Sequence, residues 1–289
     1  MIVRRGREKR GFSTLFLAFL FILSGAGVVA LKIENQGLGR ARVPGSEAQY
    51  LPSGKYLKLA SLGYSSFLAD IIYVWAIQYY SDPSVRDRFD HLDHIFGVIS
   101  ELDPEYSEPT LIGAMIAAYE ARDPKLAIKL LERAMDRNPG DWIFPLEAGH
   151  YAQMLLKDYR LAQGYYQRAM GIRGAPDIAK RLYAEALFRS DNYETALKTW
   201  LEVYQTAPDE RIRKIASNHL YEVKAALDIK RIKEAMGQFQ SRFRRRPMNL
   251  QQLVRAGLLP VLPRDLDGKE YVYDPQKGEV STAVIPWKR

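Results

Sequence analysis

The sequence predicts a mainly α-helical chain with an N-terminal transmembrane helix, a stack of antiparallel helix hairpins and a small C-terminal α+β module with a short β-hairpin. Three observations support this fold class. Residues 12–31 form a mainly apolar run without a charge, the middle of the chain repeats a helical pattern about every 34 residues, and helical periodicity stops at Pro247. The 289 residues are 47% hydrophobic and 26% charged, which is typical of globular proteins.

Charge and cysteine content narrow the kinds of site that the chain can hold. It has no cysteine, which excludes disulfides, thiolate zinc sites and cysteine nucleophiles, and which suits an oxidising compartment. The net charge of +8 comes from two short segments: residues 1–10 contribute +4, and Arg242, Arg244, Arg245 and Arg246 contribute the other four. A nucleic-acid-binding protein usually spreads Lys and Arg over a face. We therefore expect no nucleic-acid partner.

The N-terminal run predicts how the chain is located. Residues 12–31 carry no charge, and at about 1.5 Å per residue they span about 30 Å, the thickness of a bilayer core. The basic segment 1–11 should stay in the cytoplasm, because positive charge favours that side. We expect a single-pass inner-membrane protein that contacts the lipid bilayer through residues 12–31, with its body in the periplasm or outside. A cleaved signal peptide is the alternative, with Val28 and Ala30 as its cleavage pattern.

The next two segments connect this helix to the repeats. Residues 32–54 are polar, contain Gly and Pro and lack periodicity, which predicts a flexible tether. Residues 55–104 are expected to hold apolar capping helices and a degenerate first repeat. The apolar stretch 56–80 is interrupted too often to be a second span, so it should pack on the first repeat as a cap or lie on the membrane surface. Asp70, within it, is expected to face solvent.

A repeated pattern marks the central segments. In each copy a small residue is followed by a large apolar residue four positions later and by another core residue seven positions later, all on one helix face. The small residue allows two helices to approach closely, and the larger side chain fills the groove between them. The three sets are Ala127, Leu131, Ala134; Ala162, Tyr166, Ala169; and Ala196, Trp200, Val203.

This pattern, with Tyr159 and Tyr193 three residues before two of the alanines and a period of 34 to 35, resembles the tetratricopeptide repeat family. The resemblance implies an α-solenoid, with three repeats over residues 105–208. Residues 209–246 should close the array as capping helices with a break near Asp228. The first-helix Trp-x-x-Leu-Gly pattern of the family is largely missing.

The resemblance also implies a binding groove lined by the first helix of each hairpin. Its exposed positions would contact peptides of partner proteins, and the candidates are Glu147, Tyr151, Arg181, Glu185 and Arg189. The alternative is that the last three, which lie four residues apart on one helix face, form solvent-exposed ion pairs worth a few tenths of a kcal/mol.

Residues 247–289 form the C-terminal module. A short helix over 249–256 should end at Gly257, a typical C-cap, and a hairpin should turn around residues 274–278. The order Pro247-x-x-Leu250, Pro263-x-Asp265, Gly268, Tyr271 resembles the tail of the major pseudopilins of type II secretion, although Leu266 stands where the family has a second proline.

Two groups of residues are of types that could bind a metal. Asp265, Asp267 and Asp274 would be the pseudopilin-like calcium ligands, but their spacing does not make an EF-hand loop, so turn stabilisation is favoured. His91 and His94 could share a metal only with further ligands, which no pattern supplies. We expect no metal, cofactor or catalytic residues, since no phosphate-binding or nucleophile motif is present.

Together these patterns favour a non-enzymatic, membrane-anchored and exported scaffold. It would bind protein partners of an envelope assembly such as a pilus or a secretion machine. The alternative is a non-catalytic accessory subunit of a cell-envelope polysaccharide or cell-wall enzyme, whose repeat groove would bind polymer.

Overall fold

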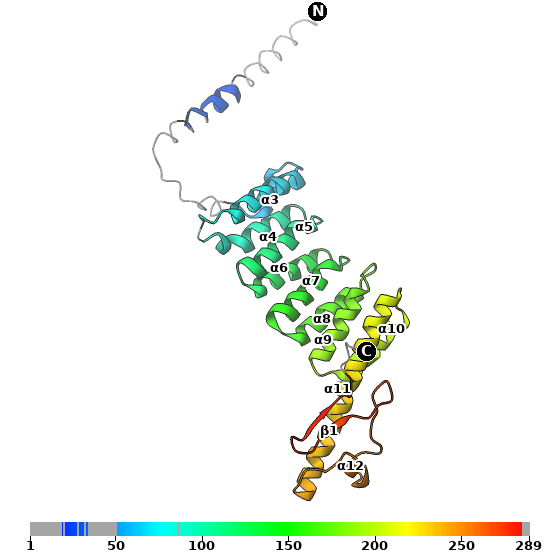
Figure 1. The fold of residues 1–289 in the computed structure, drawn as a ribbon. Coiled ribbons are helices and arrows are strands. Elements are labelled where there is room, and N and C mark those ends of the chain that lie inside the picture. The colour runs from blue at the N-terminus through cyan, green and yellow to red at the C-terminus, as the bar shows by residue number, and fades with distance from the viewer. Residues whose placement is uncertain are drawn as a thin grey trace, which may run out of the picture.

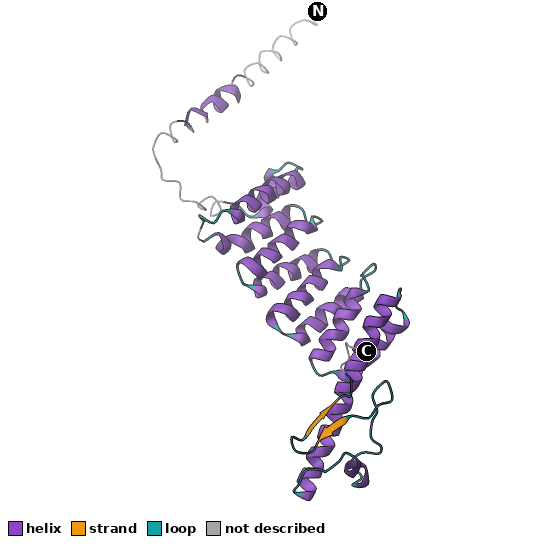
Figure 2. Cartoon of the chain, in the orientation of Figure 1, coloured by secondary structure: helices purple, strands orange, loops and turns teal. Residues whose placement is uncertain are grey.

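The computed structural model describes residues 51–85 and 87–284, together with residues 19, 21–27, 29–31 and 33. Helices that follow one another in sequence pack side by side into an elongated stack, and a two-stranded antiparallel hairpin follows (Figures 1 and 2). The helices are α2 (Gly54–Ala60), α3 (Ser65–Ser81), α4 (Leu92–Leu102), α5 (Ser107–Met115), α6 (Pro124–Arg137), α7 (Ile143–Tyr151), α8 (Tyr159–Met170), α9 (Ile178–Arg189), α10 (Tyr193–Gln205), α11 (Glu210–Phe243) and α12 (Gln251–Arg255).

Three short helical turns complete the stack. A 3₁₀ turn, Arg88–His91, precedes α4, and π-helical turns Ile116–Glu120 and Ala152–Leu156 extend α5 and α7. After each π turn a residue in the left-handed region reverses the chain, Arg122 at φ 57° and Lys157 at φ 56°. The next helices, α6 and α8, then begin in the same way, with an aspartate whose carboxylate accepts a backbone N–H at 2.9 Å.

The predicted burial of this helix face is confirmed. Ala127, Ala162 and Ala196 are fully buried, and so are Tyr166 and Trp200 at the aromatic position. These side chains belong to α6, α8 and α10, each of which packs on the helix before it. The sequence pattern therefore marks the positions where successive helices meet.

Small residues on the helices opposite accommodate the aromatic rings. A Cβ added to Gly149 of α7 would lie 2.5 Å from Cε1 of Tyr166, and one added to Gly113 of α5 would lie 2.5 Å from Cγ of Phe96 on α4. Real side chains do not approach so closely. The ring and the glycine are therefore required together for α7 and α8, and for α4 and α5, to reach their observed separation.

Helix α11 corrects one prediction. A break was expected near Asp228, but the helix runs unbroken for 34 residues, Glu210–Phe243. Its first half packs with α9 and α10 through Ala216, Leu220 and Val223, and its second half packs against the C-terminal module through Ile232 and other apolar residues. Because both halves of the helix bury apolar side chains, tertiary packing stabilises a continuous helix. This stabilisation outweighs the weak helix propensity of an internal aspartate.

Asp228 itself is held inside the helix. It is only 2% exposed, and its carboxylate accepts hydrogen bonds from the Tyr271 hydroxyl at 2.8 Å and from the Lys224 ammonium. The two donors compensate the carboxylate for the water it loses. The residue that suggested a break is therefore the point at which the module is attached.

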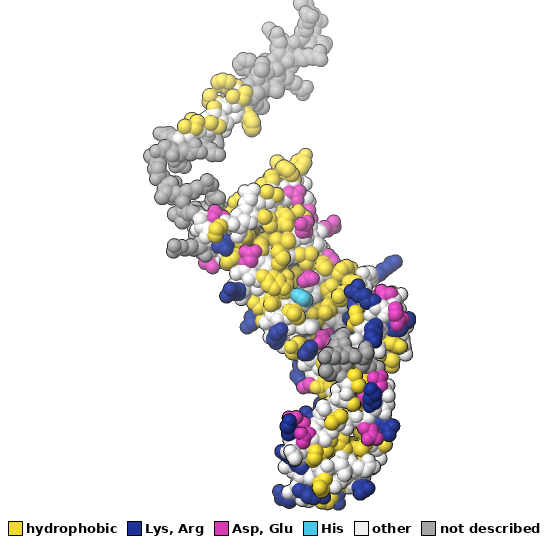
Figure 3. Space-filling model, in the orientation of Figure 1, with side chains coloured by type: hydrophobic (Ala, Val, Ile, Leu, Met, Phe, Trp, Pro, Cys, Tyr) yellow, Lys and Arg dark blue, Asp and Glu magenta, His cyan; other side chains and the backbone are white. Residues whose placement is uncertain are grey.

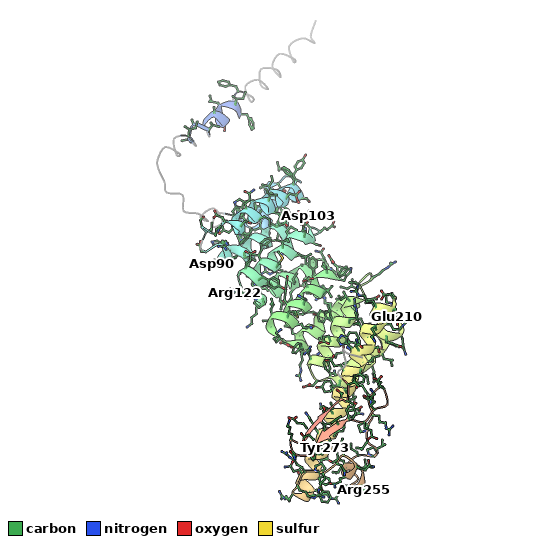
Figure 4. All side chains as sticks on the ribbon, viewed as in Figure 1. Asp90, Asp103, Arg122, Glu210, Arg255 and Tyr273 are labelled. Carbon is green, nitrogen blue, oxygen red and sulfur yellow. The ribbon has the colours of Figure 1, made fainter. Side chains whose placement is uncertain are left out.

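The C-terminal module wraps around the second half of α11 (Figure 1). Strands β1 (Val272–Asp274) and β2 (Glu279–Ser281) pair antiparallel, with Tyr273 opposite Val280, and the predicted hairpin is confirmed. Tyr273, on the strand beside α11 in Figure 4, donates its hydroxyl hydrogen to the carbonyl oxygen of Pro247 at 2.8 Å. The predicted helix over 249–256 is observed as the shorter α12, and Gly257 follows it at φ 72°.

Asp265 shows how the module's turn is stabilised. Its carboxylate accepts the backbone N–H groups of Asp267 at 3.0 Å and Lys269 at 2.8 Å, and the Tyr221 hydroxyl of α11 at 2.6 Å. Burial alone would raise the pKa of Asp265, but these hydrogen bonds outweigh it and lower the pKa below its usual value. Asp274 likewise accepts the N–H groups of Gln276 and Lys277. The two carboxylates thus act in turns, as expected.

The N-terminal region is described in part. Where the structure describes residues 19–33 the chain is helical, and apolar side chains such as Phe21 and Leu31 are exposed. No helix among the described residues is long and apolar enough to cross a membrane. The predicted span over 12–31 is described only at residues 19, 21–27 and 29–31, and segment 1–11 and most of the predicted tether lie outside the described residues.

The glycine at the ring contact gives a direct test of this packing. Gly149→Ala should lower the free energy of unfolding by about 1–3 kcal/mol, because the new methyl group overlaps Tyr166. Gly164→Ala on α8 is the control, since nothing lies within 4 Å of its added Cβ, and it should raise stability by about 0.5–1 kcal/mol through helix propensity. Urea unfolding in detergent, followed by circular dichroism, measures both. Equal effects of the two substitutions would contradict the packing described.

Candidate functional site

The candidate site is the first-helix face, which we define as the surface of α5, α7, α9 and residues 210–223 of α11. Contacts join its helices. The ring of Tyr119, in the π turn after α5, meets Tyr151 of α7 edge to face at 5.9 Å, and Glu185 of α9 approaches His219 of α11. Tyr151, Glu185 and His219 are each 34 residues apart in sequence. The same position of the 34-residue period therefore falls on α7, α9 and α11, which alternate with α8 and α10 along the chain.

The strongest polar feature is a cluster between α9 and α11. Arg189 donates from Nε to Glu185 Oε1 at 2.8 Å, which is the main cause of its raised pKa. Nδ1 of His219 lies 3.5 Å from Glu222 Oε2 and 3.8 Å from Glu185 Oε2. Two carboxylates, a guanidinium and an imidazole thus meet at one place, with Glu185 only 20% and His219 only 16% exposed.

Packing against the buried core holds this cluster in place. The imidazole of His219 stacks on the indole of Trp200 with ring centroids 4.0 Å apart and planes 13° apart. Trp200 is the buried aromatic of α10, so the apolar core of the stack supports the imidazole ring directly. Because its members sit on packed helices, the cluster is organised before any partner arrives, which lowers the entropy lost on binding.

Arg181, a predicted site residue, lies one turn before Glu185 but does not pair with it among the described residues. Its Nε is buried without a hydrogen-bond partner in that part of the chain. The side chain lines a cavity of about 340 Å³ at the junction of α9, α10 and the start of α11, together with Ile178, Val203 and Ile212. Such a cavity could hold an apolar side chain of a partner, and a neighbouring acceptor of that partner could then bind Arg181 Nε.

The predicted residues on α7 divide into two kinds. Glu147 is half-buried, whereas Tyr151 is only 4% exposed, so the expectation that it is an exposed contact position is wrong. The pKa values of Tyr151 and Tyr166 are raised above the ordinary value for tyrosine. Burial is the larger cause, and the negative charge of Glu147 is the smaller one. Tyr119, 51% exposed, presents the aromatic surface at this point instead.

The ion-pair alternative is confirmed only for one pair. Glu185 and Arg189 form the i, i+4 pair, while Arg181 stands apart from it. Since Glu185 also faces α11, its carboxylate is shared between a pair within its own helix and a contact between helices. The cluster therefore differs from a row of solvent-exposed ion pairs along a single helix.

Several buried polar atoms of α7 to α10 have no hydrogen-bond partner in the described part of the chain. An unsatisfied buried group costs about 1–3 kcal/mol, and native structures keep few of them. A partner or ordered water that reached these atoms would recover that free energy. Those of α7 to α10 and their π turn are Gln153 Oε1, Tyr166 Oη, Arg181 Nε, Glu185 Oε2 and Trp200 Nε1.

Sequence reasoning missed Tyr119, His219 and Glu222. The signal for His219 was present, because the period of 34 residues that links Tyr151 to Glu185 reaches it in the next step. It was overlooked because residues 209–246 were assigned to capping. No comparable pattern identifies Tyr119, which lies in the π turn after α5.

The histidine pair considered for a metal takes part in local structure. His94 Nε2 lies 2.7 Å from the carbonyl oxygen of Leu51, which ties α4 to the segment before α2. Within the described ranges, no three His, Asp or Glu side chains are grouped as metal ligands would be.

Charged and apolar side chains are unevenly distributed over the surface. On the face shown in Figure 3, hydrophobic side chains gather over α3 to α7, and charged side chains become frequent toward α9 to α11 and the C-terminal module. The polar cluster thus lies toward the charged half of the stack.

Comparison with models of known protein families gives no match to this chain, and no curated protein matches its sequence. Its function is therefore inferred from the residue patterns and from the geometry of the described residues.

Two tyrosines with opposite environments test the unsatisfied groups. Tyr166→Phe removes a buried hydroxyl that bonds to nothing in the described residues, so unfolding free energy should stay unchanged or rise by up to about 1 kcal/mol. Tyr271→Phe removes the donor to Asp228 and should lower that free energy by about 1–3 kcal/mol. Parallel urea titrations give both values. A clear loss of stability in Tyr166→Phe would show that its hydroxyl is satisfied in solution.

Proposed function

We propose that this chain is a membrane-anchored, exported scaffold whose first-helix face binds protein partners of an envelope assembly. The observation that carries the proposal is the cluster of Glu185, Arg189, His219 and Glu222, held on packed helices at the surface of the stack. Such a cluster offers donors and acceptors to a polar peptide segment in a fixed arrangement.

The finer fold assignment belongs to the same proposal. The pairs α5–α6, α7–α8 and α9–α10 form three tetratricopeptide-like repeats of an α-solenoid, and α3–α4 forms a degenerate first one. Support comes from the buried small and aromatic residues at spacings of 34 to 35, and from the repeated π turn and aspartate cap. In such arrays the first helices present a continuous surface to an extended or helical peptide.

Mixed charge on the face favours a protein partner over a uniformly charged polymer. Two carboxylates and one arginine meet at the cluster, and Arg181 lines the apolar cavity nearby. A peptide can supply complementary charges and an apolar side chain together, which a repeating anionic chain cannot. We therefore place Glu147, Arg181, Glu185 and Arg189 in the contact surface and add Tyr119 and His219.

Location follows from the N-terminal segment. Residues 12–31 anchor the chain in the cytoplasmic membrane, with residues 1–11 in the cytoplasm and the body in the periplasm or outside. A pilus or secretion machine is the assembly class we favour, because the C-terminal order Pro247, Pro263, Asp265 and Tyr271 resembles that of pseudopilin tails.

The second candidate is an accessory subunit of a cell-envelope polysaccharide or cell-wall enzyme. One observation favours it: Tyr119 is 51% exposed on the first-helix face, and aromatic rings are suitable platforms for sugars. In this case arginines of the face would hold the polymer.

Site-specific photo-crosslinking in native membranes tests the proposal. A benzoylphenylalanine in place of Tyr119 should capture a stoichiometric protein, whereas one in place of Asp136, exposed on α6, should not. Adding Glu185→Gln and Arg189→Gln should weaken partner binding at least tenfold, equivalent to about 1.4 kcal/mol, since both lose charge-assisted hydrogen bonds.

Two outcomes would count against this function. Capture from both positions alike, or capture unaffected by the two substitutions, would mean that the face is not the binding surface. Retention of purified cell-wall polymer by the unaltered protein, lost in an Arg181→Ala and Arg189→Ala variant, would favour the accessory-subunit candidate.

A further inference from the structure

An exposed apolar surface covers α2 and α3 at the N-terminal end of the stack (Figure 3). Seven large hydrophobic or aromatic side chains there are between 50% and 86% exposed, within a stretch of 19 residues. A patch of this kind marks an interaction site, because soluble surfaces rarely keep such groups together in water. They are Tyr56, Leu59, Leu62, Tyr64, Phe67, Ile71 and Val74.

Helix α3 is apolar on two opposite sides. Ala69, Ile72, Ala76 and Tyr80 are buried where α3 packs on α4, and Phe67, Ile71 and Val74 project from the other side. A helix that is hydrophobic all round normally has both sides covered. The stack covers one side only, so the second side requires another apolar environment.

We propose that this α2–α3 surface lies in the interfacial layer of the lipid bilayer, with its apolar side chains among the upper acyl chains. The inference goes beyond the scaffold function and shares with it only the membrane anchor.

The chain's own connectivity supports the bilayer as the occupant. The predicted span ends at residue 31, and only residues 32–50, the larger part of the predicted tether 32–54, separate it from the segment that leads into α2. A flexible chain of that length has a typical end-to-end distance of about 25 Å. The surface is therefore held close to the membrane, where a high effective concentration makes even weak insertion sufficient.

Charge on α2 is compatible with lipid headgroups. Lys55 and Lys58 are exposed on this short helix, which contains no acidic residue, and Tyr56 and Tyr64 are side chains suited to the membrane–water boundary. Such a pattern favours an anionic lipid surface over a basic protein partner.

Asp70 is the one acidic residue of α3, the helix that carries Phe67, Ile71 and Val74. Asp70 is exposed, as expected from the sequence. The pKa of Tyr106 is raised mainly by the burial of Tyr106 and next by the negative charge of Asp70. Tyr106 precedes α5 and meets Tyr73 edge to face at 5.7 Å. The charge of Asp70 therefore acts on Tyr106, next to α5, and as an exposed carboxylate it can remain in water while Phe67 and Val74 insert.

The absence of cysteine allows a direct experiment on the full-length protein. Single cysteines at Leu59, Phe67 and Val74 would carry an environment-sensitive fluorophore, and Met248→Cys, at a 73% exposed apolar position of the C-terminal module, is the control. The proteins are reconstituted in phosphatidylcholine–phosphatidylglycerol vesicles containing lipids with a nitroxide on the acyl chain.

We expect quenching at Leu59, Phe67 and Val74 to be several-fold stronger than at Met248. A second variant, with Ile71→Asp added to the Leu59 label, should reduce quenching there while vesicle flotation persists through the anchor.

Flotation with quenching no stronger than at Met248 would overturn the inference and leave the scaffold function untouched. A fluorophore shielded from water but not quenched by lipid would overturn it as well, because a protein or second copy would then cover the surface. Failure to float would contradict the anchor and the docking together.

Discussion

Helix α11 passes through two apolar cores, and the hydrogen bonds on Asp228 fix the point where one gives way to the other. Upstream, the helix completes the stack of α9 and α10. Downstream, it is the support on which the C-terminal hairpin and α12 fold. Because Tyr271 and Lys224 satisfy the buried carboxylate, the helix runs straight through a position that would otherwise favour a break. The stack and the module are therefore parts of one body.

This constraint also determines the candidate site. His219 lies on the first half of α11, stacked on Trp200 and facing Glu185, so its position depends on how α11 is seated. Tyr221, two residues later, binds Asp265 of the module. Changes in the module can thus reach the first-helix face through a single rigid element. With an anchor at one end and the α2–α3 surface on the bilayer, the face would be held at a set height and orientation above the membrane.

Much of the fold could be predicted from the sequence, because packing between neighbouring helices depends on local spacing. The buried set around Ala162 and Tyr166 is an example, and so is the C-terminal hairpin. What failed depended on contacts between distant residues. Nothing near Asp228 in sequence reveals that Tyr271 will satisfy it, and Tyr151, which was expected to be exposed, is buried and meets the ring of Tyr119 edge to face. Glu185 and Arg189 were predicted as site residues from the sequence. Predicting His219 would have required extending the 34-residue period into residues 209–246, which were assigned to capping helices.

The central claim is that α11 is a single helix joining the site to the module, and a distance across Asp228 tests it most directly. Spin labels on cysteines at Arg211 and Gln238, both exposed on α11 and separated by 27 residues, can be placed without interference from native thiols. At about 1.5 Å per residue, a continuous helix predicts a narrow distribution near 40 Å by double electron–electron resonance. A broad distribution, or a maximum well below that value, would show a hinge at Asp228 and contradict the account.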